Sequence, residues 1–188
     1  MLFITNRSFY EGSKTVINRK VTFDLNNNAP SNSVYCCIRN SKDDYTEIGS
    51  QNFIKTVQKL EYEQILLFIH GFNSLPEASI FPNAELLQLL FDQQKSGSIL
   101  LIPIIWPCDN DLGIVKDYWD DEKSADMSAF SFARTLGKFT EWSASQPKED
   151  LCLKRINILA HSMGNRVLRE SLKIWNRYDL ARGGSAAF

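Results

Sequence analysis

Ser162 has the sequence surroundings that a serine nucleophile requires. The segment from Ile156 to Leu168 reads INILAHSMGNRVL, an apolar run followed by a serine among small residues and then by helical spacing. In a nucleophile elbow the serine lies at a sharp turn between a strand and a helix. Crowding at that turn admits small residues two positions before and after the serine, and here these are Ala160 and Gly164. The pattern predicts attack by a serine hydroxyl on an acyl carbonyl.

Two backbone amides are candidates for holding the oxyanion that such an attack creates. The helix after Ser162 would direct its amide-rich N-terminus at the site, so the Met163 N–H is one candidate. The segment ILLFIHGFN predicts a buried strand that ends in a turn at His70 and Gly71, and we assign the second amide to Phe72. Two simpler interpretations remain open: Ser162 as a helix N-cap, and Gly71 as a residue that only permits the bend.

The base that would activate Ser162 is harder to identify. The chain has two histidines, His70 and His161, and neither follows Ser162. Neighbouring strand residues point to opposite faces, so we expect His161 to be a packed or hydrogen-bonded structural residue. His70 is the better candidate, since we expect its strand to neighbour the elbow strand, but in related folds this position usually braces the oxyanion loop, so a catalytic role is the minor alternative. Because a serine without a base is a weak nucleophile, we expect this chain alone to be inactive.

Three segments, ILLFIHGFN, IIWP and INILAHSMGNRVL, resemble the alpha/beta-hydrolase superfamily. They are most similar to a bacterial alpha/beta-hydrolase family of unknown function, of the domain of unknown function 900 type. The opening FITNR and the stretch from Tyr118 to Ser128 fit the same resemblance. The resemblance implies an α/β fold with an eight-stranded, mostly parallel sheet flanked by helices. It also implies a Ser–Asp–His triad, but no particular substrate.

Carried over residue by residue, the resemblance implies Ser162 as the nucleophile and Met163 and Phe72 as the oxyanion donors. The acid and the histidine of such a triad normally follow the nucleophile. Asp179 comes too early, in or just after the elbow helix, and no later histidine exists. We therefore expect the N-terminal portion of a longer hydrolase that lacks its last strands. The strand at 156–160 would then be an exposed edge, open to a pairing partner or to self-association.

Composition indicates a single globular domain spanning residues 1–188, because 188 residues with 44% hydrophobic content can build one core. Scattered charges with a net charge of −1 argue against nucleic acid. No apolar run could span a bilayer and no signal-peptide pattern is present, so we expect a cytoplasmic protein. The four cysteines show no C-x-x-C spacing, which favours reduced, inert thiols and predicts no metal or cofactor.

Apolar periodicity places the elements that would position these residues. We predict strands at 2–6, 21–25, 34–39, 65–69, 100–106 and 156–160, a loop at 26–33, a polar connector at 146–150, and helices at 76–94, at 124–143 and after Ser162. Pro103 should mark a strand start or a bulge.

Other side chains have open interpretations. The helix predicted at 76–94 would bury Leu86, Leu87, Leu90 and Phe91. An acidic stretch, Asp109 to Glu122, should be a solvated loop with Asp121 as a helix cap. Trp106, Trp119 and Phe81 could line an acyl pocket, but core is the favoured interpretation.

These observations favour a serine hydrolase of esterase or lipase type that acts on a small-molecule ester or related acyl bond. Transfer of the acyl group to an alcohol would use the same site. The alternative is a non-catalytic, hydrolase-like binding module that a partner completes.

Overall fold

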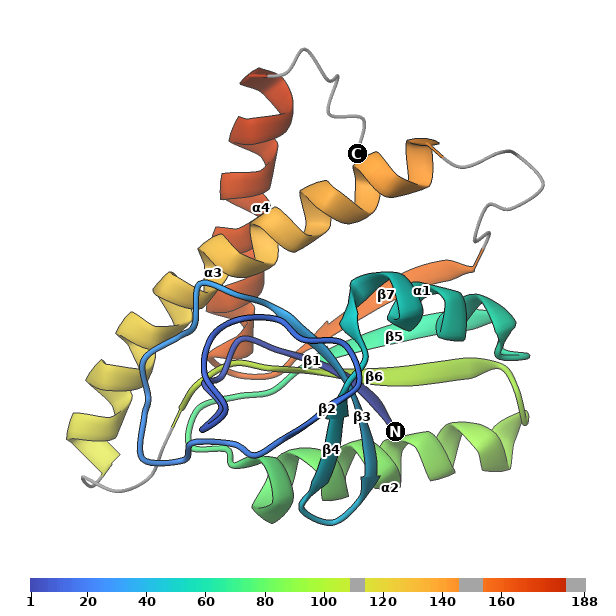
Figure 1. The fold of residues 1–188 in the computed structure, drawn as a ribbon, viewed down its shortest axis with the longest axis horizontal. Helices are drawn as coiled ribbons and strands as arrows, with labels where there is room; N and C mark the ends of the chain where they lie inside the picture. The colour runs from blue at the N-terminus through green and yellow to red at the C-terminus, as the bar shows by residue number, and fades with distance from the viewer. Residues whose placement is uncertain (109–113, 146–153, 182–188) are drawn as a thin grey trace.

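A seven-stranded mixed sheet forms the centre of the computed structural model, which describes residues 1–108, 114–145 and 154–181 (Figure 1). The strand order is β2-β4-β3-β1-β6-β5-β7. The strands are β1 (Leu2–Thr5), β2 (Arg19–Val21), β3 (Tyr35–Ser41), β4 (Asp44–Glu47), β5 (Gln64–Ile69), β6 (Ile99–Ile105) and β7 (Arg155–Ala160). β1, β6, β5 and β7 pair in parallel, whereas β3, β4 and β2 join through antiparallel pairs. The predicted α/β class, with a mostly parallel sheet, is confirmed.

Helices cover both faces of this sheet. They are α1 (Gly49–Lys59), a short π-helical turn η1 (Pro76–Ile80), α2 (Phe81–Gln94), α3 (Ile114–Ser145) and α4 (Gly164–Ala181). Val57 of α1 and Val167 of α4 pack over one face, and Ala84 of α2 packs with Phe68 on the opposite face. Among the described helices, none combines the length and the apolar composition needed to cross a membrane.

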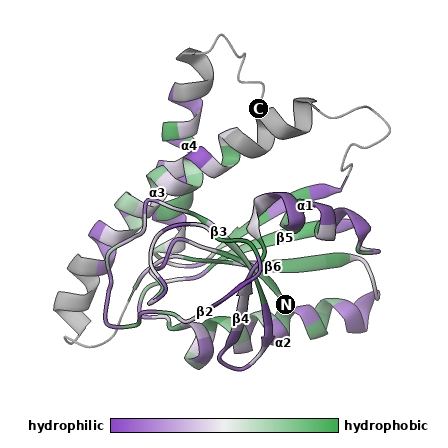
Figure 2. Ribbon diagram, in the orientation of Figure 1, coloured by the Kyte–Doolittle hydropathy of each residue, from purple (hydrophilic) through white to green (hydrophobic). Residues whose placement is uncertain are grey.

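The central strand β6 is buried from residue 100 to its end, as its apolar sequence predicts (Figure 2). Pro103, however, lies inside the strand opposite Phe68 of β5, not at a start or a bulge. The Ile105 carbonyl accepts a hydrogen bond from the Asn6 amide, just beyond β1. Backbone groups two residues apart in a strand point the same way, so an N–H at position 103 would also point toward β1. The ladder to β1 begins only at Ile104, so the missing N–H of Pro103 leaves no paired position empty.

Two elements near the N-terminus are absent from the sequence prediction. β4 has the short polar sequence DYTE, and α1 buries only Phe53 and Val57. The strand expected at 21–25 is instead β2, which ends at Val21, because Phe23 joins the sheet edge only through an isolated bridge to Phe9.

Two helix predictions are corrected by packing. Leu87 and Phe91 of α2 pack on the sheet, but Leu86 and Leu90 are 55% and 48% exposed, because α2 meets the sheet along a narrow face. Helix α3 begins at Ile114, ten residues before the predicted start at 124. Asp121 is therefore inside the helix and is not its cap, and residues 117–122 are not a loop. The predicted connector at 146–150 and the residues Asp109, Asp111 and Cys152 lie outside the described part of the chain.

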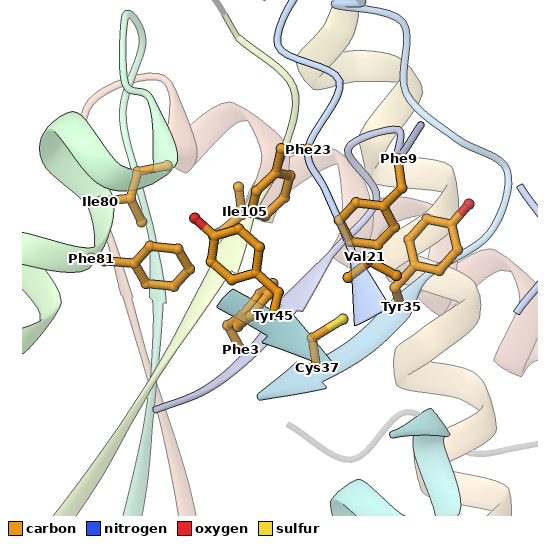
Figure 3. Close-up of a cluster of buried hydrophobic side chains, with 10 residues drawn as sticks. All are labelled: Phe3, Phe9, Val21, Phe23, Tyr35, Cys37, Tyr45, Ile80, Phe81 and Ile105. Atoms are coloured by element: carbon orange, nitrogen blue, oxygen red, sulfur yellow. The ribbon is translucent and has the colours of Figure 1, made fainter. Parts of the chain in front are cut away.

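The antiparallel half of the sheet has an aromatic core (Figure 3). Tyr45 of β4 stacks on Phe81 at 5.8 Å between ring centroids and meets Phe3 and Phe23 edge-on. Phe81 is thus a core residue, as favoured from sequence. The neighbouring thiols fit inert core cysteines, since Cys36 and Cys37 are free and buried, and burial raises the pKa of Cys36 to about 12.

Candidate active site

Ser162 lies at the turn between β7 and α4, where the sequence predicts a nucleophile elbow. Its φ of 51° places a non-glycine residue in the left-handed region, and its side chain is exposed. Such a conformation costs on the order of 1–3 kcal/mol and persists only where the surroundings impose it. Here the His161 amide donates to the Ile69 carbonyl at 2.9 Å, and the Gly164 amide donates to the His161 carbonyl at 2.8 Å. The turn is therefore anchored to β5 on one side and to the start of α4 on the other.

Gly164 explains why this turn needs a small residue after the serine. A Cβ at this position would lie 2.6 Å from both the Ile69 and the His70 carbonyl oxygens. These are backbone atoms at the end of β5 and cannot move aside as a flexible side chain would. Ala160 is half-buried beside the cluster that contains Met163 and Val167. The spacing of small residues thus follows from close contact between the elbow and β5.

The loop after β5 forms the second arm of the site. A Cβ on Gly71 would lie 2.7 Å from His161 Nδ1 and 3.0 Å from Ser162 Cβ, so the loop backbone passes directly against the serine. Gly71 therefore permits a close approach rather than only a bend. Phe72 follows, and Asn73 has a left-handed φ of 56°.

An open cavity of about 680 Å³ lies between these two arms. It brings together the three residues predicted for the chemistry, Ser162, Met163 and Phe72. Its wall is Phe72, Glu122, Ser162, Met163, Asn165, Arg166, Leu168, Arg169 and Leu172. Its volume is in the range of pockets for small molecules. Among the described residues, no hydrogen bond uses the Met163 amide.

His70 is buried and both of its ring nitrogens are bonded to backbone, an arrangement that favours a bracing role over that of a base. It is fully buried and stacks on Trp106 with ring centroids 5.0 Å apart. The Trp106 amide donates to Nε2 at 3.1 Å, so Nδ1 carries the proton and donates to the Gly71 carbonyl at 2.8 Å. Burial lowers the pKa of His70 to about 4, so the ring is neutral near pH 7. Trp106 is a core residue of this brace and not part of an acyl pocket.

His161 adjoins Ser162 in sequence but is not bonded to it. Its side chain is exposed, and within the described part of the chain no hydrogen bond joins the two side chains. Only the side of the His161 ring that faces Gly71 is packed, so the prediction of a packed residue holds in part. Asp179, judged too early for the triad acid, lies in α4. Trp119 lies outside the residues whose side chains are described.

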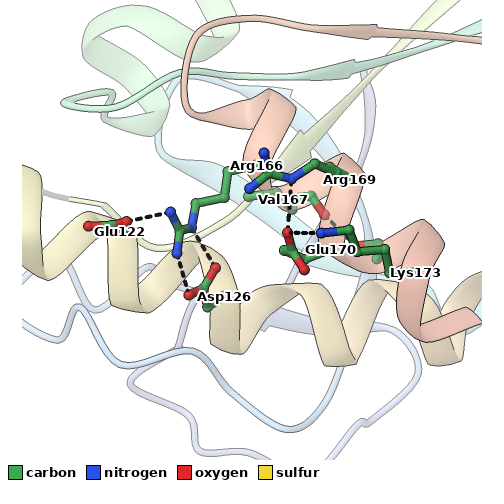
Figure 4. A network of polar contacts seen from close by, with 8 residues as sticks. Glu122, Asp126, Arg166, Val167, Arg169, Glu170 and Lys173 are labelled. Atoms are coloured by element: carbon green, nitrogen blue, oxygen red, sulfur yellow. Dashed lines mark hydrogen bonds and ion pairs between the residues drawn. The ribbon is translucent and has the colours of Figure 1, made fainter.

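Sequence reasoning missed the polar groups of α3 and α4 that surround this site (Figure 4). Arg166 projects from the first turn of α4 and pairs with Glu122 and Asp126 of α3. Asp121, fully buried, bonds to the loop after β5. No local pattern marks these residues, because partners about 40 positions apart meet only after α4 packs on α3.

The sheet, its flanking helices and the strand–turn–serine–helix geometry define a protein of the alpha/beta-hydrolase class. A family model described as alpha/beta hydrolase of unknown function (DUF900) matches residues 46–179. The chain belongs to this family, and the resemblance seen in its sequence is confirmed. No curated protein and no solved structure matches the chain.

Proposed function

We propose that this protein is a serine hydrolase that cleaves an ester or related acyl bond, and that residues 1–188 form one alpha/beta-hydrolase-like domain. The observation that carries the proposal is the strained, exposed Ser162 at a strand–helix turn, with Gly164 two residues after it and Gly71 of the β5 loop packed against it. Neither Gly164 nor Gly71 has room for a Cβ. A plain helix N-cap needs none of this crowding, and N-cap residues normally have extended backbone.

The chemistry would follow the acyl-enzyme route. The Ser162 hydroxyl oxygen attacks the carbonyl carbon and gives up its proton to a base, while the carbonyl π electrons move to the oxygen. The Met163 and Phe72 N–H groups would stabilise that oxyanion. Collapse of the intermediate expels the alcohol, and water then releases the acid. Hydrolysis and acyl transfer share the first half, so added alcohol as competing acceptor would separate them.

Neither of the two histidines is placed to supply the base of this mechanism. Both ring nitrogens of His70 are bonded to backbone, and His161 makes no bond to Ser162. We therefore propose that a group beyond the described residues accepts the serine proton. Added imidazole should then accelerate acylation, because a small base can diffuse into the open cavity.

Covalent labelling by a fluorophosphonate tests this function. We expect a phosphonyl adduct on Ser162 by peptide mass spectrometry, faster with imidazole and absent in Ser162→Ala. A matched control is Ser50→Ala, because Ser50 is likewise an exposed serine and lies at the start of another helix, α1. Failure to form an adduct at Ser162 at alkaline pH with imidazole would overturn the proposal.

A second candidate function, binding without catalysis, is favoured by strand β7. Within the described residues β7 pairs only with β5, and Ile156, Ile158 and Leu159 are 40%, 39% and 42% exposed. An extended segment of a partner could pair with this edge. A protein that captures such a segment but gives no Ser162 adduct would favour this function over hydrolysis.

A further inference from the structure

Helix α3 contacts the loop that would hold the oxyanion. Asp121 is fully buried, although most aspartates lie at the surface. Its Oδ2 accepts the Asn73 amide at 3.2 Å, and its Oδ1 accepts the Asn28 side-chain amide at 3.0 Å. Bonds to a carboxylate are stronger than those between neutral groups. A single carboxylate thus ties the oxyanion loop to the body of the protein.

The Asn73 bond fixes a left-handed residue of that loop. Asn73 has a left-handed φ of 56° and directly follows Phe72, the proposed oxyanion donor. The peptide bond that joins Phe72 to Asn73 carries the Asn73 N–H, so fixing this N–H restrains the C-terminal side of Phe72. Because oxyanion donors work only when aimed at the developing charge, this restraint also limits how far the Phe72 amide can turn.

The next turn of α3 also forms ion pairs with α4, the helix that follows Ser162 (Figure 4). Arg166 Nε and Nη2 donate to the two Asp126 oxygens at 2.6 and 2.8 Å, and Nη1 donates to Glu122. Glu122 and Asp126 are one turn apart and would repel each other without the cation between them. Arg166 is four residues beyond Ser162, so this pair fixes α4 next to the nucleophile.

We propose that residues 121–126 of α3 form a clamp that sets the spacing between the oxyanion loop and the elbow, with Asp121 as its positioning residue. Asp121 holds the left-handed Asn73, and Glu122 and Asp126 hold the helix that starts after Ser162. Asp121 touches no reacting atom and acts through the loop. The catalytic meaning of the clamp rests on the proposed hydrolase function, whereas its structural part does not.

Asp121→Asn tests the clamp with little change in shape. An asparagine has one acceptor oxygen and cannot receive both amides, so one bond is lost. We expect hydrogen exchange at the Asn73 amide to accelerate about tenfold, consistent with roughly 1.4 kcal/mol of lost protection. Fluorophosphonate labelling of Ser162 should slow by about tenfold in its maximal rate, with half-saturating probe concentration unchanged. Unchanged exchange at Asn73 would overturn the clamp.

Glu47→Gln is the matched control for burial of a carboxylate. Glu47 is also fully buried and accepts a backbone amide, from Val16 at 3.2 Å, and a side-chain donor, Arg19 Nε at 2.8 Å. It lies in the antiparallel half of the sheet. This variant should lose stability without altering Asn73 exchange or the labelling of folded protein. If it matches Asp121→Asn in both readouts, Asp121 has only a general structural role.

Two further results separate failure of the clamp from failure of the hydrolase proposal. If Asp121→Asn does not fold, Asn28→Ala removes one contact of the same carboxylate and should accelerate Asn73 exchange by about threefold; no acceleration would overturn the clamp. If wild-type protein forms no adduct at Ser162, the hydrolase proposal fails. Slow exchange at Asn73 that depends on Asp121 would still support the structural clamp.

Discussion

The two halves of the sheet use left-handed backbone differently. In the antiparallel half, formed by β2, β4 and β3, the non-glycine residues with positive φ are Asn18 and Asp43 at exposed turns. Asparagine and aspartate tolerate that conformation. In the parallel half, formed by β6, β5 and β7, they are Asn73 and Ser162, on the two arms of the cavity. Serine has no such tolerance, so packing must impose its conformation.

The two halves also differ in what stabilises their packing. The antiparallel half is stabilised by a buried cluster of contacting aromatic rings. The site end of the parallel half depends on contacts between backbone atoms, such as Gly164 against the end of β5. We infer that damage to the antiparallel half should reduce stability, whereas damage at the site end should remove reactivity as well.

The largest expected effect on stability is in the aromatic core. Tyr45 is 3% exposed, and Tyr45→Ala should cost about 3–5 kcal/mol in the free energy of unfolding, because it leaves a cavity among three rings. Urea denaturation measures the loss. Labelling of Ser162 per folded molecule should not change. A variant that stays folded but loses labelling would show that the two halves are not separable.

Gly164→Ala should affect both quantities. Its Cβ would overlap two backbone carbonyls, so α4 must move away from β5, at about 3 kcal/mol and with loss of labelling. The control is Gly12→Ala, where φ is 89° but a Cβ meets nothing within 4 Å. That change should cost only about 1 kcal/mol, the price of left-handed backbone, with labelling retained. Equal effects of the two variants would remove the distinction between the halves.

Acid should destabilise the folded protein through the buried His70. The pKa of His70 is about 4 in the folded protein and near 6.5 when unfolded, so the unfolded state binds more protons between these values. The His70 contribution is complete above pH 6.5 and is lost as pH falls to 4, by roughly 3 kcal/mol. Denaturation midpoints at pH 7, 5.5 and 4.5 measure this slope. His70→Gln should flatten it, and an unchanged slope would assign the effect elsewhere.

The smallest effect is expected on β7. Ile158 is 39% exposed, so Ile158→Thr should change stability by no more than about 0.5 kcal/mol. Ile102 of β6 is 1% exposed, and the same change there should cost about 2–3 kcal/mol, because a methyl is lost and a hydroxyl is buried. Thermal unfolding of the pair compares the edge with the centre. A large loss for Ile158→Thr would indicate that β7 is covered in solution.

The sequence by itself determined the elements whose signal is local. The apolar runs of β5, β6 and β7, the small residues around Ser162 and the helix that follows are each set by neighbours within about ten positions. Their buried strands and glycine turns place Ser162, Met163 and Phe72 at one end of the sheet. The α/β class and the family resemblance could be read from these segments alone.

The tertiary structure decided what depends on distant partners. Three features follow from residues many positions away. They are the face of α2 that is buried, the tolerance of Pro103 inside β6, and the role of Asp121 as a buried anchor rather than a helix cap. Arg166 likewise finds its carboxylates only once α4 lies on α3. A local pattern records which side chains prefer burial or a turn. It cannot record which backbone amide a buried carboxylate will meet, because long-range packing sets that pairing.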